Sequence, residues 1–415
     1  MTELEKQGMA AKAAAYELST MGTLRKNHGL EAIARALKEE QSQWIKANAE
    51  DLAAARAEGM RPALLDRLAL TPQRIADIVE GIRQVAALPD PIGKVDHMET
   101  RPNGLMIGRK RVPLGVVAII YEARPNVTVD AAVLCLKSGN ACILRGGKEA
   151  IRSNRAAAEI MRRALEKAGL PAGCISLVQD TSRETANQLM HLDEFVDVLI
   201  PRGGSGLIRT VAKNASVPVI RTGEGVCHIY IDREADLEMG ARILYNAKCS
   251  RPSVCNAAEC VVVHQDVSAD FWKKALPLLD QDQVELRCDR DALKILGNRG
   301  VPAEESDWDE EYGDYILAVR TVKDVEEAVR FINTHSTGHS ECIVTGSYSS
   351  AQFFLNAVDA AAVYVNASTR FTDGGEFGLG AEIGISTQKM HARGPMGLEE
   401  LTSYKYIVYG QGQTR

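Results

Sequence analysis

The sequence predicts an α/β protein with two doubly wound parallel-sheet domains and a small additional β element. Three observations support this prediction: the length of 415 residues, a composition typical of globular proteins, and short β-type runs that alternate with helical segments. A chain of this length corresponds to two or three domains at roughly 150 residues each. Alternating strands and helices are typical of right-handed βαβ units, which build parallel sheets covered by helices.

Composition and charge exclude several classes of protein. Hydrophobic residues make up 45% and charged residues 25% of the chain, which excludes a disordered, collagen-like or disulfide-scaffold protein. The net charge of −6 argues against non-specific binding to nucleic acid. We expect no membrane span, because the apolar run 114–120 is far shorter than the ~18 residues required. The N-terminus has no signal-peptide pattern, and nine cysteines without a C-x-x-C pair predict reduced thiols in a cytoplasmic protein.

The N-terminal ninety residues are predicted to be helical. Residues 31–49 place apolar side chains near helical spacing, and Thr71 followed by Pro72 is a favourable helix start. Residues 104–112, followed by Pro113, predict a short hairpin.

From residue 116 onward strand and helix signals alternate, which predicts the first parallel sheet. The predicted strands are 116–120, 141–144, 175–178, 196–200 and 217–220, and the predicted helices lie near 126–137, 154–167, 184–191 and 206–213. Sheets of this kind bind nucleotides at the carboxyl ends of their strands. We expect a dinucleotide-binding domain over 1–225, with a hairpin near 101–113 that belongs to a separate β element.

A second alternating set predicts the other α/β domain, over 226–395. It contains a helix at 237–248, a loop at 250–256, and strands at 260–263, 315–319, 342–345 and 362–366. The glycine-rich stretch 374–380 is predicted to be a loop. The tail 396–415 contains the β-type, aromatic run 403–409, which we expect to pair with the edge of another sheet.

Two glycine-containing turns are candidates for holding phosphate groups. The turn 201–206 follows a predicted strand and opens a helix, so the N–H groups of Gly203, Gly204 and Ser205 could approach phosphate oxygens; a tight turn needing glycine for steric reasons alone fits equally well. Arg145 and Lys148 follow another strand, where basic residues would accommodate the 2′-phosphate of NADP; ordinary solvated loop cations are the alternative.

Cys255 and Asn126 are the candidates for chemistry. Cys255 lies in a loop of small residues four positions after Arg251, whereas the cysteines at 135, 142, 174, 260 and 342 lie in apolar runs. A nucleophilic cysteine needs partial exposure and a positive environment, although a structural thiol is also possible. Asn126 could donate its amide to a developing oxyanion, or it could cap the helix that follows.

Other chemistries have little support in the sequence. His335 and His339 are separated by Thr337-Gly338, which indicates a loop, so we predict no metal site. The G-x-S-x-G and G-x-x-x-x-G-K-[ST] patterns are missing from the sequence, which argues against a serine hydrolase and a P-loop enzyme.

Several segments together resemble the aldehyde dehydrogenase superfamily and, within it, the γ-glutamyl phosphate reductase (glutamate-5-semialdehyde dehydrogenase) family. The segments that carry the resemblance are 113–117, 120–128, 144–149, 200–204, 251–257 and 377–386, with Asn366 following a strand. The resemblance implies an aldehyde dehydrogenase-like fold in which the hairpin and the C-terminal strand form an oligomerisation element.

The resemblance also implies roles for individual residues. It implies Cys255 as the nucleophile, Asn126 in the oxyanion hole and NADPH as the cofactor, with Glu310 at the nicotinamide ribose and the adjacent Glu311 as the alternative. Arg221 stands where hydrolytic family members carry a general-base glutamate, although Glu224 is close in sequence. Loss of that base suits a reductase, because activated water would destroy a thioester intermediate.

The expected reaction is NADPH-dependent reduction of L-glutamyl 5-phosphate to glutamate 5-semialdehyde with release of phosphate, in proline synthesis. The alternatives are another acylating aldehyde dehydrogenase, using coenzyme A or a different acyl phosphate, and a non-catalytic nucleotide-binding protein. The expected partners are the small-molecule substrate and further copies of the chain, with glutamate 5-kinase as an additional candidate; nucleic acid and membrane are not expected.

Overall fold

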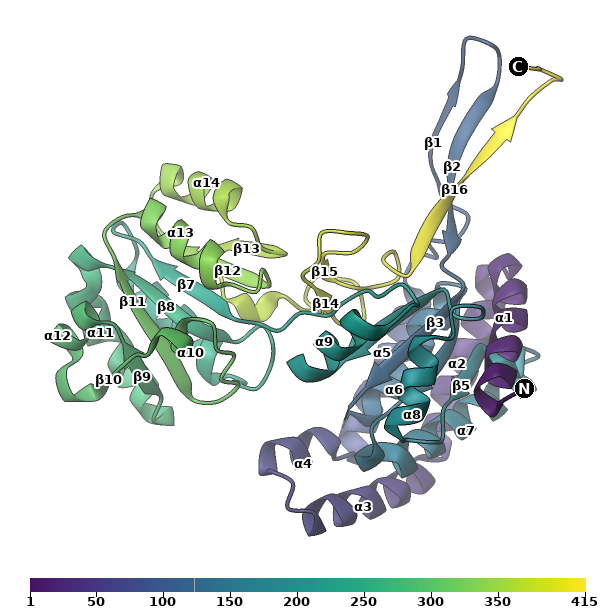
Figure 1. Cartoon of the computed structure of the whole chain (residues 1–415), viewed down its shortest axis with the longest axis horizontal. Coiled ribbons are helices and arrows are strands. Elements are labelled where there is room, and N and C mark those ends of the chain that lie inside the picture. Colours follow the sequence, from purple (N-terminus) through teal and green to yellow (C-terminus); the bar gives the residue numbers. More distant parts are fainter. Residues whose placement is uncertain (123) are drawn as a thin grey trace. The chain divides into compact units, whose positions relative to one another are not determined.

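A computed structural model describes residues 1–122 and 124–415, without the side chains of residues 62, 63 and 205. The chain divides into two compact units, each coloured along the sequence in Figure 1. The first unit comprises residues 1–222, 378–384 and 396–415, and the second comprises 223–377 and 385–395. Each unit contains its own parallel sheet.

The first unit begins with five helices. They are α1 (Glu3–Thr20), α2 (Thr23–Glu39), α3 (Gln41–Ala57), α4 (Pro62–Leu68) and α5 (Pro72–Ala87). The predicted start of α5 is confirmed, because the Thr71 hydroxyl accepts a hydrogen bond from the Arg74 N–H at 3.2 Å. Its apolar residues Ile75, Val79 and Ile82 recur at helical spacing and are buried.

The parallel sheet of the first unit has four strands in the order β5-β4-β3-β6. The strands are β3 (Val116–Tyr121), β4 (Ala141–Arg145), β5 (Ile175–Leu177) and β6 (Val198–Arg202), and the helices that follow them are α6 (Pro125–Lys137), α7 (Ile151–Lys167), α8 (Arg183–Met190) and α9 (Ser205–Asn214). Strands β4 and β5 lie on one side of β3, while β6 pairs with its other side. The strand order therefore reverses at β3, and a crevice outside the carboxyl ends of β3 and β6 is the expected ligand position in such a sheet.

Two strand predictions in this unit were wrong in detail. The predicted strand 217–220 is reduced to an isolated bridge between Leu199 and Val219, because Pro218 has no N–H group with which to continue a ladder. The hairpin predicted within 104–112 was also misplaced. Met106–Pro113 is a single strand, β2, and its hairpin partner β1 (Val95–Thr100) precedes the turn.

A three-stranded antiparallel sheet completes the first unit. The C-terminal strand β16 (Thr402–Tyr409) pairs with β2 along its whole length, from Thr402 opposite Pro113 to Tyr409 opposite Met106, so β2 lies between β1 and β16. This confirms that the C-terminal run pairs with another strand. Figure 1 shows the three strands extending away from the helices and four-stranded sheet of the same unit.

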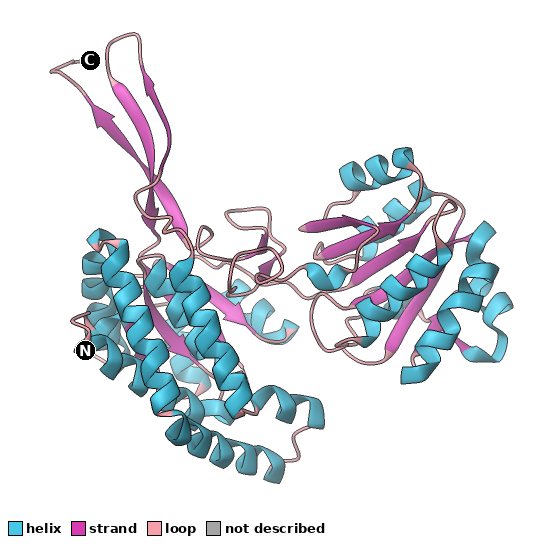
Figure 2. Cartoon of the chain, turned by 180° about the vertical axis from the view of Figure 1, so that it is seen from behind, coloured by secondary structure: helices cyan, strands magenta, loops and turns pink. Residues whose placement is uncertain are grey.

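The second unit contains a seven-stranded parallel sheet in the order β10-β9-β11-β8-β7-β12-β13. Its strands are β7 (Cys227–Ile231), β8 (Ala258–His264), β9 (Glu285–Cys288), β10 (Gly300–Pro302), β11 (Ile316–Val322), β12 (Ser340–Val344) and β13 (Ala362–Val365). The helices are α10 (Leu237–Cys249), α11 (Gln265–Leu279), α12 (Arg290–Leu296), α13 (Val325–His335) and α14 (Tyr348–Ala357), and they cover both faces of the sheet (Figure 2). A short pair, β14 (Ile385–Ser386) and β15 (Gly394–Pro395), also belongs to this unit.

The predicted α/β class with two parallel sheets is confirmed. The glycine-rich stretch 374–380 is a loop, as expected. Within the described part of the chain, no helix has both the length and the apolar character that a bilayer crossing requires.

Candidate active site

The turn before α9 lies at the carboxyl end of β6, next to the end of β3. The N–H of Gly204 donates a hydrogen bond of 2.9 Å to the carboxylate of Glu122, which follows β3. Gly203 lets the Glu122 carboxyl group lie close to this turn, because a Cβ at this position would overlap that group unless the Glu122 side chain moved. At Gly204 and Gly206, by contrast, a Cβ would meet no described atom within 4 Å. The start of α9 thus has room for phosphate oxygens, which fits a dinucleotide, although Glu122 already accepts one N–H.

Arg145 and Lys148 lie at the end of β4, at the same edge of this sheet. The Arg145 guanidinium donates to the carbonyl oxygens of Thr181 at 2.5 Å and Ser182 at 3.1 Å, so it also anchors the loop before α8. Burial lowers the pKa of Arg145, and nearby carboxylates, among them Glu149, oppose this shift. Lys148 is exposed and its ammonium group lies 3.0 Å from the Glu58 carboxylate. Both cations remain candidates for contacting a cofactor phosphate.

Asn126 occupies the second position of α6, immediately after the end of β3. Arg124, and not Asn126, is the N-cap residue of α6, and the Asn126 Nδ2 group donates to the Asp130 carboxylate at 2.9 Å. Burial raises the pKa of Asp130 to about 6, against the opposing effects of the Asn126 hydrogen bond and the charge of Arg202. The capping alternative for Asn126 is therefore not what the structure shows.

Cys255 lies in the loop between α10 and β8 in the second unit. It is partly exposed, whereas the other eight cysteines are buried, and all nine carry free thiols. The Cys227 thiol donates to the carbonyl oxygen of Cys255 at 3.2 Å. A Cβ at Gly225 would overlap the same carbonyl group, so the segment before β7 packs directly against the backbone of the cysteine. These contacts hold the loop while its thiol stays accessible.

Asn256 connects the cysteine loop to the short helical turn Thr369–Phe371. Its Nδ2 group donates to the carbonyl oxygens of Arg370 at 3.2 Å and Thr372 at 2.9 Å, and its own carbonyl accepts from the Thr369 hydroxyl at 2.7 Å. The Arg370 guanidinium in turn donates to the Asn256 side-chain oxygen and, at 3.1 Å, to the hydroxyl of Ser250.

Arg370 brings positive charge to this loop. Burial lowers its pKa, the nearby Arg251 lowers it further, and Asp373 and Cys255 oppose the shift. Two arginines therefore act electrostatically on one another beside Cys255. A neighbouring cation is the environment that favours a thiolate and attracts an anionic substrate.

The predicted ribose contact, Glu310, is exposed, and its neighbour Glu311 is the residue tied to the cysteine region. The Glu311 carboxylate accepts a hydrogen bond of 3.1 Å from the N–H of Gly225, the glycine that packs against Cys255. Because the two glutamates are adjacent in sequence, only the fold distinguishes them. Glu311 is accordingly the stronger candidate for this role.

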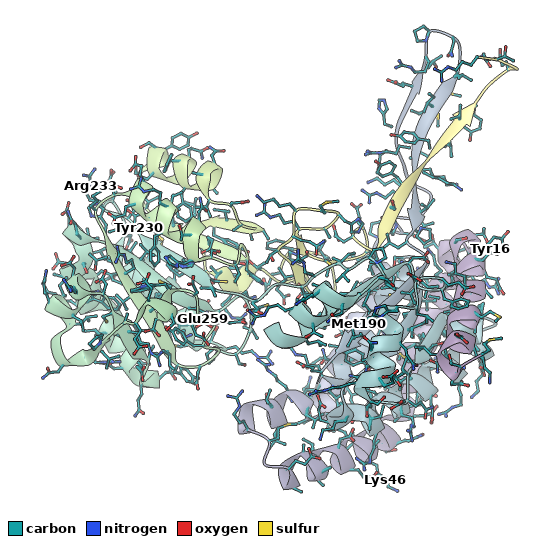
Figure 3. The ribbon with its side chains drawn as sticks, viewed as in Figure 1. Tyr16, Lys46, Met190, Tyr230, Arg233 and Glu259 are labelled. Atoms are coloured by element: carbon teal, nitrogen blue, oxygen red, sulfur yellow. The ribbon has the colours of Figure 1, made fainter. Side chains whose placement is uncertain are left out.

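A buried ion pair lies beside the loop that carries Glu311. The ammonium group of Lys248, on α10, is 2.6 Å from the carboxylate of Glu259, on β8, and both side chains are almost fully buried. The other Glu259 oxygen accepts from the N–H of Gly313 at 3.2 Å, which ties the loop carrying Glu311 to the sheet. Figure 3 marks Glu259 in this unit.

The structure brings the predicted residues into two groups. The first unit places Asn126, Arg145 and the glycines before α9 at one edge of its sheet, and the second places Cys255 near the loop of Glu311. The side chain of Ser205 lies outside the described residues. Sequence reasoning missed Glu122 and Asp130; Asp130 follows Asn126 by four residues on a predicted helix, and that spacing is a signal that could have revealed it. Among the described residues, no group of three or more metal-ligating side chains forms a metal site.

The combination of fold and site defines a class of protein. The family model described as "Aldehyde dehydrogenase family" matches residues 2–292 and 299–407. The chain belongs to the aldehyde dehydrogenase family, which confirms the resemblance found in its sequence segments.

Within that family, the chain is similar to proteins named gamma-glutamyl phosphate reductase. It is 56% identical over 415 residues to the protein from Clostridium beijerinckii and 57% identical over 415 residues to that from Heliobacterium modesticaldum, covering 99–100% of each. The crystal structure of gamma-glutamyl phosphate reductase from Thermotoga maritima matches with a TM-score of 0.96 and 45% identity, with complete coverage of both chains.

Proposed function

We propose that the chain reduces L-glutamyl 5-phosphate to L-glutamate 5-semialdehyde with NADPH, releasing phosphate, as a step of proline synthesis. The observation that carries this proposal is the partly exposed thiol of Cys255 beside Arg370, in a chain more than half identical to proteins named for this reaction. A thiol nucleophile and an adjacent cation suit an acyl phosphate, whose phosphate is both the anionic handle and the leaving group.

The reaction follows from what the side chains can do. The Cys255 thiolate attacks the acyl carbonyl, and the Asn126 amide with the Cys255 N–H stabilises the oxyanion; each such donor is typically worth about 3 kcal/mol. Arg251 and Arg370 hold the phosphate as the C–O bond breaks and the Cys255 thioester forms. NADPH supplies the hydride that reduces this thioester. Collapse of the hemithioacetal then releases the aldehyde and regenerates the thiol.

The start of α9 and the cations after β4 support the cofactor assignment. A Cβ at Gly204 or Gly206 would meet no described atom, and the diphosphate is proposed to bind at this helix start, with Arg145 and Lys148 supplying positive charge for the 2′-phosphate. Glu311, rather than Glu310, is proposed to contact the nicotinamide ribose.

We also propose that the three-stranded sheet joins copies of the chain. The side chains of β1 are exposed along the whole strand, and Tyr404, Tyr406 and Val408 of β16 are at least half exposed. Exposed aromatic residues at a sheet edge favour burial against an identical strand element.

A coupled assay tests the reaction. Purified glutamate 5-kinase, ATP and glutamate supply the acyl phosphate, and NADPH consumption is followed at 340 nm for the wild type and Cys255→Ala. We expect turnover only with the wild type. Near-normal turnover by Cys255→Ala would refute covalent catalysis by this residue, and oxidation of glutamate 5-semialdehyde that required coenzyme A in place of phosphate would favour a different acylating enzyme.

Thiol labelling tests separately whether Cys255 is the accessible thiol, with the other cysteines of the same chain as the matched control. Iodoacetamide should modify one thiol per native chain, because eight of the nine cysteines are buried. Cys255→Ala should abolish that labelling while the denatured variant still labels at the other eight.

A further inference from the structure

In the hydrogen bond between Asn126 and Asp130, the asparagine amide is the donor and the carboxylate is the acceptor. The two residues are four apart on α6, which places their side chains on the same face of the helix. At 2.9 Å, the Asn126 Nδ2 group donates to an Asp130 carboxylate oxygen. An ionised carboxylate has only acceptors, so it selects the amide nitrogen and rejects the amide oxygen at this position.

This selection matters for an amide that must act as a donor. A primary amide carries two N–H groups on one side and an oxygen on the other, and rotation by 180° exchanges them at little steric cost. If Asp130 engages one N–H, the second N–H has a fixed position and remains a donor. An amide rotated the other way would displace the donor and point an oxygen lone pair toward the carboxylate.

The surroundings of Asp130 shift the pKa of its carboxyl group toward neutral pH. Burial raises its pKa to about 6, while the Asn126 hydrogen bond and the charge of Arg202, at the end of β6, favour the ionised form. The Arg202 Nε group is itself buried and makes no hydrogen bond to any described residue. Asp130 is therefore a half-buried carboxylate that accepts a hydrogen bond from Asn126.

We propose that Asp130 is a positioning residue that fixes the Asn126 amide as an oxyanion donor, by holding one N–H and leaving the other for the reacting carbonyl oxygen. The inference rests on the proposed function, since it assumes the role of Asn126 in acyl-phosphate reduction. It assigns Asp130 no contact with substrate.

A double-mutant cycle tests this inference in the full-length chain. Asn126→Ala, Asp130→Ala and the double variant are assayed with the kinase-coupled reaction. We expect Asn126→Ala to lower kcat by about 10²–10³-fold. Asp130→Ala should lower kcat by about 10-fold or more with KM for the acyl phosphate nearly unchanged. The double variant should be no slower than Asn126→Ala, because the two residues act through one donor.

The pH profile supplies a second readout that a purely structural residue would not change. In the wild type, kcat should fall below about pH 6 as Asp130 becomes protonated and can donate to the amide oxygen. Asp130→Asn, which keeps the size of the side chain, should lose this limb, and Asp130→Glu should restore part of it. Circular dichroism of each variant checks that the chain is folded.

The outcomes separate this inference from the proposed function. If Cys255→Ala retains activity, the proposed function fails. If Cys255→Ala and Asn126→Ala are impaired but Asp130→Ala and Asp130→Asn keep the wild-type kcat and pH profile, the positioning role alone is refuted. Additive losses in the double variant would also refute it.

Discussion

The ammonium group of Lys248 lies 2.6 Å from the carboxylate of Glu259, and both are shielded from solvent. The pair connects α10 to β8, and through the N–H of Gly313 it holds the loop that carries Glu311. Burial lowers the pKa of Lys248 and raises that of Glu259, with each partner's charge opposing the other's shift. In this interior, each buried charge is therefore stabilised by the opposite charge of its partner.

Removing one member of this pair should destabilise the second unit. Lys248→Met leaves the Glu259 carboxylate buried without its cation, and such a change typically costs about 3–5 kcal/mol. The midpoint of urea unfolding, followed by circular dichroism, should fall. The double variant Lys248→Met/Glu259→Leu is the control, and it should recover much of the loss; a further drop in the midpoint would show that the two side chains contribute independently.

A side chain at residue 225 should disturb the cysteine loop. In Gly225→Ala the added methyl group would overlap the Cys255 carbonyl, so we expect loss of reductase activity and altered alkylation kinetics of the thiol. Gly81→Ala is the matched control, because Gly81 lies inside α5 with no described atom near an added Cβ. That substitution should raise stability by roughly 0.5–1 kcal/mol. Normal activity in Gly225→Ala would contradict the packing.

The burial of Asp130 also predicts a pH-dependent stability. Its folded pKa of about 6 lies above the unfolded value of about 3.9, so the folded state binds the proton more tightly. Its contribution is therefore favourable at low pH and is lost as pH rises through 6, by about 3 kcal/mol at most. Asp130→Asn should become progressively more stable than the wild type from pH 4.5 to 7, as measured by urea unfolding. A constant difference over that range would refute the raised pKa.

We predict that Lys148 contributes to the preference for NADPH, which carries a 2′-phosphate, over NADH, which lacks it. Its ammonium group is exposed at the end of β4. Lys148→Glu should reduce the ratio of kcat/KM for NADPH over NADH by about 10-fold or more, because a carboxylate repels the 2′-phosphate and can accept from a ribose hydroxyl. Lys46→Glu on α3, labelled in Figure 3, carries the same charge change and should leave the ratio unaltered.

The exposed face of β16 predicts assembly through the three-stranded sheet. Tyr406 is 66% exposed and packs edge-on against Tyr404. Tyr406→Lys should lower the oligomeric mass measured by analytical ultracentrifugation, since a charge opposes burial at an interface. Tyr16→Lys on α1, at a side chain 79% exposed, is the control. An unchanged mass in the Tyr406 variant would exclude this face as an interface.

The sequence predicts best those elements whose burial is evident from the apolar pattern of their own residues. Strand β3 is buried at every position, and its unbroken apolar run is a clear strand signal. Strand β1 is exposed at every position and contains Asp96, His97 and Glu99, so no apolar pattern marks it, and the hairpin was misplaced. Its pairing is decided by β2 rather than by its own composition.

The candidate site shows the same difference between residues that stand out in the local sequence and residues whose contacts arise only from the fold. Cys255 and Asn126 were chosen as candidates from their local sequences alone, whereas the preference for Glu311 over Glu310 depends on Gly225, 86 residues away along the chain. The contact of Glu122 with Gly204 spans 82 residues and leaves no spacing signal in the sequence. Tertiary contacts of this kind become visible only once the chain is folded.

The pairing of β16 with β2 has a consequence for synthesis of the chain. About 290 residues separate Pro113 from its partner Thr402. At 5–20 residues per second, roughly 15–60 s pass on the ribosome between the emergence of β2 and that of β16. During that interval one edge of β2 has no partner from its own chain, so a nascent polypeptide stalled before residue 402 is the form most exposed to edge-to-edge aggregation and to capture by chaperones.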